Sequence, residues 1–287
     1  MEDNFRPNSV VIINCSLNAP LILIAIAGNT LVLAAILRTP SLRSPSTVFL
    51  CSLAVSDLAV GFVVQPLYIT YKLTGNLSVY TALAIMAAGG TGVSLLIMTA
   101  ISVDRLLALH YHMRYPSLMT THRALYTSVT LGLIVCLLSL LILWKISAYY
   151  FTAAVVILIC LVVSTVCYIR IFRIVRQHQL QIHAQRQVVE ILNSRAHQDM
   201  QQVKKSAKNT FIYYIVMILC YAPLIISMLI LSIAPNHWTS IWGLTDTVVF
   251  TNSAINPFLY CWRIRELRKA VVKTAWDILC KQTAANS

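Results

Sequence analysis

The sequence predicts an all-α membrane protein, a seven-transmembrane helix bundle followed by an amphipathic eighth helix. Of its 287 residues, 58% are hydrophobic and only 11% are charged, and the mean hydropathy is +0.75. A soluble domain carries about 25% charged residues, so we expect lipid to contact most of the surface. The apolar runs show no period-two alternation, which indicates helices, because only helices and closed barrels satisfy their backbone groups in lipid.

Seven apolar stretches are long enough to cross the hydrocarbon core, which takes about 20 helical residues. They lie at residues 18–37, 48–71, 80–109, 124–143, 149–171, 211–234 and 241–262. Only residues 144–148 separate the fourth stretch from the fifth, so one long buried hairpin is an alternative there. No small-residue cleavage site follows the first stretch, and we expect it to remain as a span.

The positions of Lys and Arg predict the orientation, because cytoplasmic loops carry the excess of these residues. Seven basic residues lie between the fifth and sixth spans and six follow the seventh, whereas the other side has only Arg6, Lys72 and Lys145. The N-terminus is therefore expected outside, and anionic lipid at the inner leaflet accounts for the net charge of +13 without a nucleic-acid partner. The expected regions are an extracellular N-terminus at 1–17, a seven-helix domain at 18–262, and helix 8 with a cytoplasmic tail at 263–287.

Two Asn-X-Ser triplets, at Asn14 and Asn76, fall on the predicted outer side and are candidate glycosylation sites. Cys15 is the only cysteine expected outside, so no disulfide between extracellular loops is predicted. The connection at 170–208 is rich in Gln and basic residues, which indicates cytoplasmic extensions of two helices rather than a domain. An inverted-repeat transporter usually has an internal repeat, and we find none in the sequence.

Asp57 lies in the middle of the second span. An ionisable side chain is costly inside the membrane, so its presence indicates a functional site. Five polar residues of other spans are available as its partners: Asn29, Ser94, Asn252, Ser253 and Asn256. A carboxylate among oxygen donors suits a small hard cation such as sodium. The alternative is a structural hydrogen-bond cluster or a protonated Asp57.

Asp104 and Arg105 end the third span on the cytoplasmic side, where an adjacent acid can hold the Arg in one state and release it in another. The alternative is an ordinary Arg that extends to the interface. Pro223 in the sixth span and Pro257 in the seventh remove backbone hydrogen bonds and permit kinks.

These residues together resemble the rhodopsin-like class of G-protein-coupled receptors, because the motifs occur in the right order on the right spans. The matching segments are Gly28-Asn29, Leu53-Ala54-Val55-Ser56-Asp57 for L-A-x-x-D, Asp104-Arg105-Leu106 for D-R-Y, Cys220-Tyr221-Ala222-Pro223 for C-W-x-P, and Asn256-Pro257-Phe258-Leu259-Tyr260 for N-P-x-x-Y. Residues 263–273 look like the eighth helix, and Cys280 beyond them is a palmitoylation candidate.

The resemblance implies a receptor that signals to heterotrimeric G proteins from the plasma membrane, with arrestin and a receptor kinase as further partners. It places an allosteric sodium site, and no other cofactor, at Asp57, Ser94, Asn252 and Asn256. The residues that it implies for activation and G-protein coupling are Asp104, Arg105, Met113, Tyr168, Tyr221, Pro223, Asn256, Pro257 and Tyr260.

The chain departs from the family pattern at several positions. Tyr80 stands where most relatives have a disulfide Cys, Cys160 where most have a Pro, and the second extracellular loop is very short. These departures give a weaker resemblance to the melanocortin, cannabinoid and lysophospholipid receptors, although the intact Asn256-Pro257 pair argues against a close melanocortin relative. Val203 offers Arg105 no acidic partner on the sixth span, so we expect appreciable basal activity.

The pocket residues narrow the class of ligand. Ala87 occupies the position of the amine-recognising Asp and Phe250 that of the retinal Lys, so neither a monoamine receptor nor an opsin is expected. Asp246 is the sole acid in the outer half of the bundle and could meet a cationic ligand. Its alternatives are a helix-start acid or a pair with Lys72. The candidate ligand-binding residues are Tyr68, Tyr71, Tyr221, Met228, Asp246 and Phe250.

The small residues at 87–92 indicate either close helix packing or a roomy cavity for a bulky peptide or lipid. The predicted function is a ligand-activated receptor, and the alternatives are a small-ion or solute transporter or channel, or a non-signalling decoy receptor. No enzyme is expected, since His110 and His112 at the end of the third span point apart.

Overall fold

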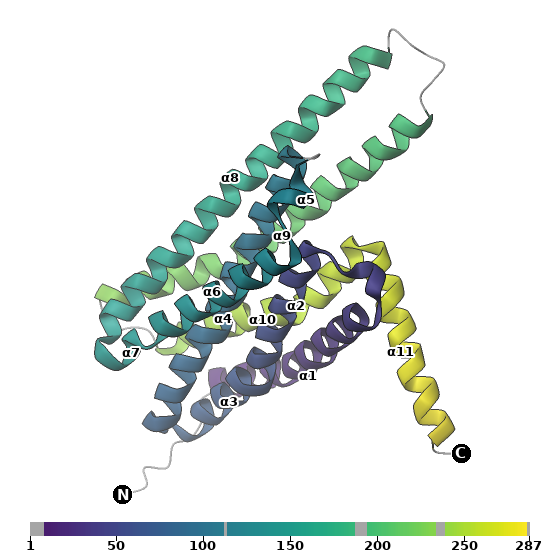
Figure 1. The fold of residues 1–287 in the computed structure, drawn as a ribbon. Coiled ribbons are helices and arrows are strands. Elements are labelled where there is room, and N and C mark those ends of the chain that lie inside the picture. Colours follow the sequence, from purple (N-terminus) through teal and green to yellow (C-terminus); the bar gives the residue numbers. More distant parts are fainter. Residues whose placement is uncertain (1–8, 112–113, 187–193, 234–238, 286–287) are drawn as a thin grey trace, which may run out of the picture.

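The computed structural model describes residues 9–111, 114–186, 194–233 and 239–285. Its long helices form an elongated bundle, and α8 and α9 extend beyond the other helices at one end (Figure 1). The elements are α1 (Ser9–Arg38), η1 (Pro40–Leu42), α2 (Pro45–Ala59), the π-helical η2 (Val60–Val64), α3 (Gln65–Thr74), α4 (Leu77–His110), α5 (Tyr115–Leu118), α6 (Thr121–Ser139), α7 (Leu141–Trp144), α8 (Ile146–Arg186), α9 (Ser194–Ile233), α10 (Thr239–Arg263) and α11 (Arg265–Ala285).

The predicted fold class is confirmed, because the described residues form helices, turns and bends without a strand. Six helical segments of the described residues are long and apolar enough to cross a membrane: Ser9–Arg38, Pro45–Thr74, Leu77–His110, Thr121–Trp144, Ile146–Gln177 and Tyr214–Leu231. The seventh span is α10, which has 25 residues and a length of about 37 Å. Polar residues inside α10 lower its hydropathy.

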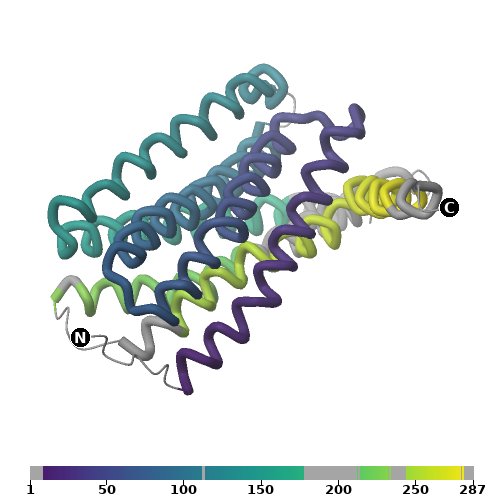
Figure 2. Tube along the Cα trace, turned by 90° about the horizontal axis from the view of Figure 1, so that it is seen from below, coloured from purple at the N-terminus to yellow at the C-terminus, as the bar shows by residue number. Residues whose placement is uncertain are grey.

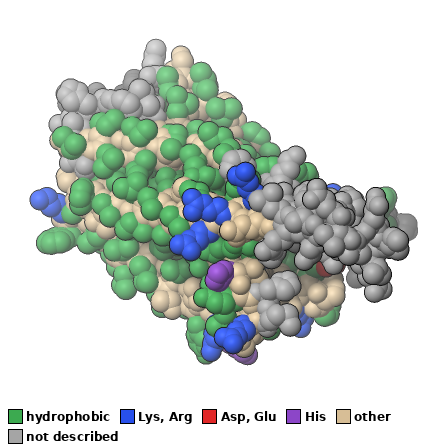
Figure 3. All heavy atoms as spheres, turned by 90° about the horizontal axis from the view of Figure 1, so that it is seen from above, with side chains coloured by type: hydrophobic (Ala, Val, Ile, Leu, Met, Phe, Trp, Pro, Cys, Tyr) green, Lys and Arg blue, Asp and Glu red, His purple; other side chains and the backbone are tan. Residues whose placement is uncertain are grey.

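The helices close into a ring because the last span packs against the first. α10 contacts both α1 and α9, α8 contacts α9 and α4, and α4 contacts α2 and α6. α1 and α6 lie at opposite sides of the bundle, with α2 and α4 between them (Figure 2). One face of the surface is covered mainly by hydrophobic side chains (Figure 3), as lipid contact requires.

The first span begins earlier than expected. α1 starts at Ser9 rather than at residue 18, so residues 9–17 extend the helix into the region that the sequence predicts as an extracellular tail. The physical reason is that Asn14 and Asn18, which look like tail residues in the sequence, are both buried in the bundle and share a hydrogen bond from the Asn18 side chain to the Asn14 carbonyl, 2.8 Å.

The second span contains a π-helical turn that the sequence analysis does not foresee. Pro66 has no backbone N–H, so the carbonyl four residues earlier loses its usual partner. η2 lies directly before this position and α3 resumes at Gln65. Single π-helical turns occur often at functional sites, and this one turns Gln65 and Tyr68 into the core, where both are fully buried.

The fourth and fifth spans are separate transmembrane helices. α7 ends at Trp144 and α8 begins at Ile146, so Lys145 alone joins them. Leu133 and Leu137 of α6 and Trp144 are exposed on the outside of the bundle. The alternative of a buried hairpin is therefore wrong.

A helix follows the seventh span, and it continues to Ala285, beyond the expected range of 263–273. α11 turns away from the bundle axis (Figure 1) and packs against α1 and α10. Leu267, Ala270 and Thr274 are buried on its inner side, while Val272 and Trp276 are exposed. This arrangement is typical of an amphipathic helix at a membrane surface.

Candidate functional site

Asp57 lies at the centre of the bundle and is fully buried. Its Oδ1 accepts a hydrogen bond from the Ser94 hydroxyl of α4 at 3.0 Å, and its Oδ2 accepts one from the Asn256 amide of α10 at 2.8 Å. Ser56 extends the cluster with a hydroxyl 2.9 Å from that of Ser94. The carboxylate thus joins the second, third and seventh spans and does not face lipid.

Asn29 connects the first span to the seventh. Its amide donates to the carbonyls of Ala25 at 2.9 Å and of Ser253 at 3.1 Å. The two helices approach closely here because a Cβ at Gly28 would lie 2.9 Å from Cγ of Pro257. Only glycine fits at this crossing, so the Gly28-Asn29 pair holds α10 in the position from which Asn256 reaches Asp57.

The chemistry of this cluster fits a sodium ion. Within the described part of the chain, the buried Oδ1 atoms of Asn252 and Asn256 have no hydrogen-bond partner, while the Asn252 amide lies 3.5 Å from Met98 Sδ. A buried acceptor without a partner is costly, and a hard cation takes such oxygens together with a carboxylate and a hydroxyl.

Asp104 is held at the cytoplasmic end by three groups. Its carboxylate accepts hydrogen bonds from Tyr115 of α5 at 2.6 Å and from Ser46 of α2 at 2.7 Å, and it lies 3.5 Å from the Arg105 guanidinium. Asp104 is buried, whereas the Arg105 side chain is 31% exposed. Burial and the hydrogen bond to Asp104 raise the pKa of Tyr115, so this phenol stays protonated and donates.

Tyr115 and Ser46 are not predicted from the sequence. Neither belongs to a motif, and they lie 11 and 58 positions from Asp104. Only the fold brings a short helix of the second cytoplasmic loop and the start of α2 to the same carboxylate. Met113, which the resemblance assigns to coupling, lies outside the described residues.

The remaining activation candidates line the core between α4, α8, α9 and α10. The Tyr168 hydroxyl lies 3.0 Å from that of Ser102, and its ring contacts Tyr214. Tyr168 and Tyr260 border one small cavity, with a volume of about 10 Å³. They therefore stand close together while Arg105 is held by Asp104.

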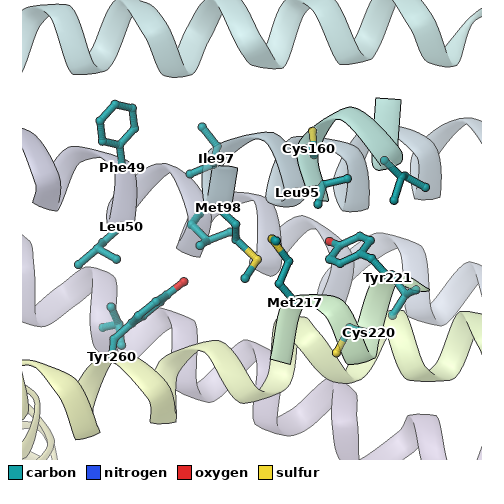
Figure 4. Packing of buried hydrophobic residues seen from close by; sticks show 14 of the residues in the cluster. Phe49, Leu50, Leu95, Ile97, Met98, Cys160, Met217, Cys220, Tyr221 and Tyr260 are labelled. Carbon is teal, nitrogen blue, oxygen red and sulfur yellow. The ribbon is translucent and has the colours of Figure 1, made fainter. Parts of the chain in front are cut away.

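Tyr221 stands where the family motif has a Trp. It is buried, and its hydroxyl donates to the Thr91 carbonyl of α4 at 3.2 Å. Figure 4 shows Tyr221 and Met217 of α9 directed toward Leu95 and Met98 of α4. Pro223 lies inside α9, two residues further along, and Pro257 lies inside α10.

The outer half of the bundle contains two small cavities of about 80 and 70 Å³. Tyr68, Met228, Asp246 and Phe250 line the larger one, and Tyr221 and Met228 line the smaller one. Tyr71 lines neither cavity and packs on the Tyr80 ring at 5.1 Å.

The small residues of the third span were compatible with either close helix packing or a roomy cavity. The two volumes are too small for the roomy cavity. Close packing holds at Gly92, where a Cβ would lie 2.8 Å from Val135 Cγ1. At the outer end of the third span, the Tyr80 hydroxyl lies 3.0 Å from that of Tyr150. This bond joins α4 to α8, and the described cysteines form no disulfide.

Asp246 makes no ion pair or hydrogen bond within the described residues. The Lys72 ammonium, its expected alternative partner, lies over the rings of Tyr68 at 5.3 Å and Tyr71 at 5.6 Å, and it acts on Asp246 through its charge without an ion-pair contact. Asp246 lines the larger outer cavity among tyrosine rings, so its carboxylate is available to a molecule in that cavity.

A second polar cluster, at the outer end, was not foreseen from the sequence. The Asn18 amide donates to Thr247 Oγ1 at 2.9 Å, and Asn18 Oδ1 accepts from the Gln65 amide at 3.3 Å. The Thr247 hydroxyl donates to Asn14 Oδ1 at 3.4 Å. No motif marks these residues, because α1, α3 and α10 meet only in the folded bundle.

The candidate modification sites differ in accessibility. Asn14 is buried and hydrogen-bonded in α1, which argues against a glycan there. Asn76 is exposed and caps α4, with its side chain accepting from the Ser78 N–H at 2.8 Å. Cys280 is exposed on α11.

In the described part of the chain, seven long helices form a ring around a buried carboxylate, with an Asp-Arg pair at the cytoplasmic end, which is the architecture of a seven-helix membrane protein. The chain belongs to the rhodopsin family of seven-transmembrane receptors: residues 28–147 and 132–260 match the family described as 7 transmembrane receptor (rhodopsin family). The match runs from Gly28 of the first motif to Tyr260 of the last. The protein is therefore a multi-pass membrane protein of a family of receptors, not enzymes, whose general partners are G proteins.

Proposed function

We propose that this chain is a ligand-activated receptor of the plasma membrane that transmits an extracellular signal to a heterotrimeric G protein. The observation that supports this most is the position of Arg105, which is partly exposed at the cytoplasmic end and is held by a single ion pair of 3.5 Å. Asp104 has two closer partners in Ser46 and Tyr115, so it can release Arg105 without being left unsatisfied.

Activation is a population shift between two arrangements of the bundle. A ligand in the outer cavities would contact Tyr221, whose hydroxyl ties α9 to α4. Pro223 gives α9 a flexible point next to this contact. Movement of α9 there would open the cytoplasmic end, where Arg105, Tyr168 and Tyr260 would contact the G protein. Arrestin and a receptor kinase would act at the same end.

The polar centre would stabilise the resting arrangement by holding sodium. Bound sodium would neutralise the buried carboxylate of Asp57. Ser94, Asn252 and Asn256 offer the oxygens around it. When the helices move, Asn256 would lose its contact with Asp57 and move together with α10. The burial of these residues and the unpartnered Oδ1 atoms of Asn252 and Asn256 support this proposal.

The ligand we propose is a peptide, a lipid or another molecule that is not a monoamine, with a cationic group directed to Asp246. Asp246 has no ion pair among the described residues and lines the larger outer cavity. Asp246→Lys should abolish the response to a cationic agonist while surface expression stays at the wild-type level. Unchanged agonist potency in this variant would remove Asp246 from the ligand site.

The function is tested in cells that express the full chain, with a panel of peptides and lipids and parallel cAMP, calcium and inositol phosphate measurements. We expect one compound to give a response that Arg105→Ala abolishes at equal surface expression. A ligand that binds the receptor but changes none of the three messengers would identify a non-signalling decoy receptor and overturn the proposal.

A further inference from the structure

A large groove lies on the outside of the bundle. It has a volume of about 930 Å³ and runs between α2, α4 and α6. Along α6 and the residue that follows it, the lining reaches from Thr121 to Leu140, a distance of about 28 Å at 1.5 Å per residue. The groove thus follows the bundle over most of the hydrocarbon thickness of about 30 Å.

The two ends of the groove differ in chemistry. Its cytoplasmic end holds Arg43, Ser44, Thr47 and Thr121, and the rest is lined almost entirely by apolar side chains. None of the lining residues is acidic. Arg43 is exposed, and its side chain makes no ion pair or hydrogen bond within the described residues.

Gly89 opens the middle of the groove. A Cβ on Gly89 would meet nothing within 4 Å, whereas a Cβ on the next residue, Gly90, would lie 3.0 Å from Val60 Cγ2. Gly89 is therefore level with Val60, directly after the end of α2. Val60 lies 15 residues after Pro45, the first residue of α2, so the distance along the helix from Pro45 to this level is about 22 Å. A long extended chain whose head lies at Arg43 would reach Gly89.

We propose that the groove binds an anionic glycerophospholipid of the cytoplasmic leaflet, with its phosphate on Arg43 and one acyl chain along α4 as far as Gly89. The guanidinium binds phosphate in a bidentate way, which a sterol hydroxyl cannot match. The apolar walls would otherwise lack close packing along one side. This inference is independent of the ligand and of G-protein coupling.

The test uses the purified full-length receptor, titrated with dioleoylphosphatidylglycerol, with bound lipid counted by native mass spectrometry. Arg43→Gln should weaken binding about fivefold. The matched control is Arg38→Gln at the exposed end of α1, which does not line the groove. Equal losses in the two variants would show that cytoplasmic charge, and not this site, attracts the lipid.

The acyl chain is tested by filling the groove. Gly89→Leu should weaken binding about fourfold for each methylene that it displaces. Gly132→Leu is its control, because a Cβ there also meets nothing within 4 Å but Gly132 lies outside the groove. The short-chain dioctanoylphosphatidylglycerol should not distinguish the two glycine variants.

Three further results would overturn the proposal. They are equal binding of dioleoylphosphatidylcholine, displacement of the anionic lipid by cholesterol, and equal binding by Gly89→Leu and Gly132→Leu. Size-exclusion profiles and melting temperatures show whether each variant is folded. Arg43→Lys, which keeps the charge but not the bidentate geometry, should bind more lipid than Arg43→Gln and less than the wild type, and thereby separate loss of the site from loss of the fold.

Discussion

Asp57 shows at the scale of a single residue how a buried charge organises a membrane bundle. A carboxylate in lipid needs partners, and Asp57 obtains them from Ser94 and Asn256 on two other helices. Each partner comes from a different span, so a change in the relative position of these helices changes the environment of the carboxylate.

Sodium should therefore raise the melting temperature of the purified receptor relative to potassium at the same ionic strength. A ligand at 100 times its Kd contributes about 2.7 kcal/mol, and each kcal/mol corresponds to about 2–4 °C for a chain of this size. Asp57→Asn should remove the sodium effect, and Ser94→Ala should reduce it.

The control for Ser94→Ala is Ser52→Ala, because the Ser52 hydroxyl bonds only the Val48 carbonyl of its own helix. A sodium-dependent stabilisation that survives in Asp57→Asn would refute the sodium proposal and leave Asp57 as the centre of a structural hydrogen-bond cluster.

Asp104 is the second residue whose charge we expect to control the receptor. Asp104→Asn removes the ion pair with Arg105 but keeps acceptor and donor capacity for Tyr115 and Ser46. An ion pair that is partly exposed to solvent contributes about 1 kcal/mol, which corresponds to about a fivefold change in the ratio of active to resting receptor. Ligand-free second-messenger production should rise by up to this factor in Asp104→Asn.

Wild-type basal activity should already exceed vector background, because position 203 is a valine and offers Arg105 no acidic partner. Tyr115→Phe, which keeps the Asp104 charge, provides the comparison at equal surface expression. A basal signal at vector background in both the wild type and Asp104→Asn would contradict this prediction.

At the scale of the helix, the close crossing of α1 and α10 determines where the last span stands. Pro257 packs against Gly28, and Asn29 donates to the carbonyl of Ser253. Because α10 carries both Asn252 and Asn256, the α1 contact positions the amides that face Asp57.

Gly28→Val should therefore lower the melting temperature of the receptor by several degrees. Its Cβ would come within 2.9 Å of Pro257, and overpacking costs about 1–3 kcal/mol. At Gly132 a Cβ meets nothing within 4 Å. Gly132→Val should therefore change the free energy of unfolding by less than about 1 kcal/mol. Equal melting temperatures for the two variants would contradict the close crossing.

At the scale of the whole molecule, orientation follows from charge and is open to a chemical test. If the N-terminus lies outside, Asn76 carries a glycan, because it is exposed at the start of α4. Asn76→Gln should then abolish the electrophoretic shift that a glycosidase produces, while Asn14→Gln should leave it unchanged because Asn14 is buried. A shift that depends on Asn14 instead would place the start of α1 outside the bundle.

The sequence by itself determined the class of fold, the number of spans and the residues of the polar centre. Hydrophobic length sets these features, because each span must satisfy its own backbone hydrogen bonds in lipid. Asp57, Ser94 and Asn256 could be grouped in advance, since a buried carboxylate requires polar neighbours and the spans offer few.

Only the tertiary structure decided the contacts between elements that no local pattern records. Tyr115 and Ser46 meet Asp104, Asn18 meets both Gln65 and Thr247, and Asn14 is buried instead of exposed. Periodicity and hydropathy describe one helix at a time, whereas these contacts depend on the rotation and depth of two or three helices together. The same reason holds for the lipid-facing groove, which exists only because α2, α4 and α6 leave it open between them.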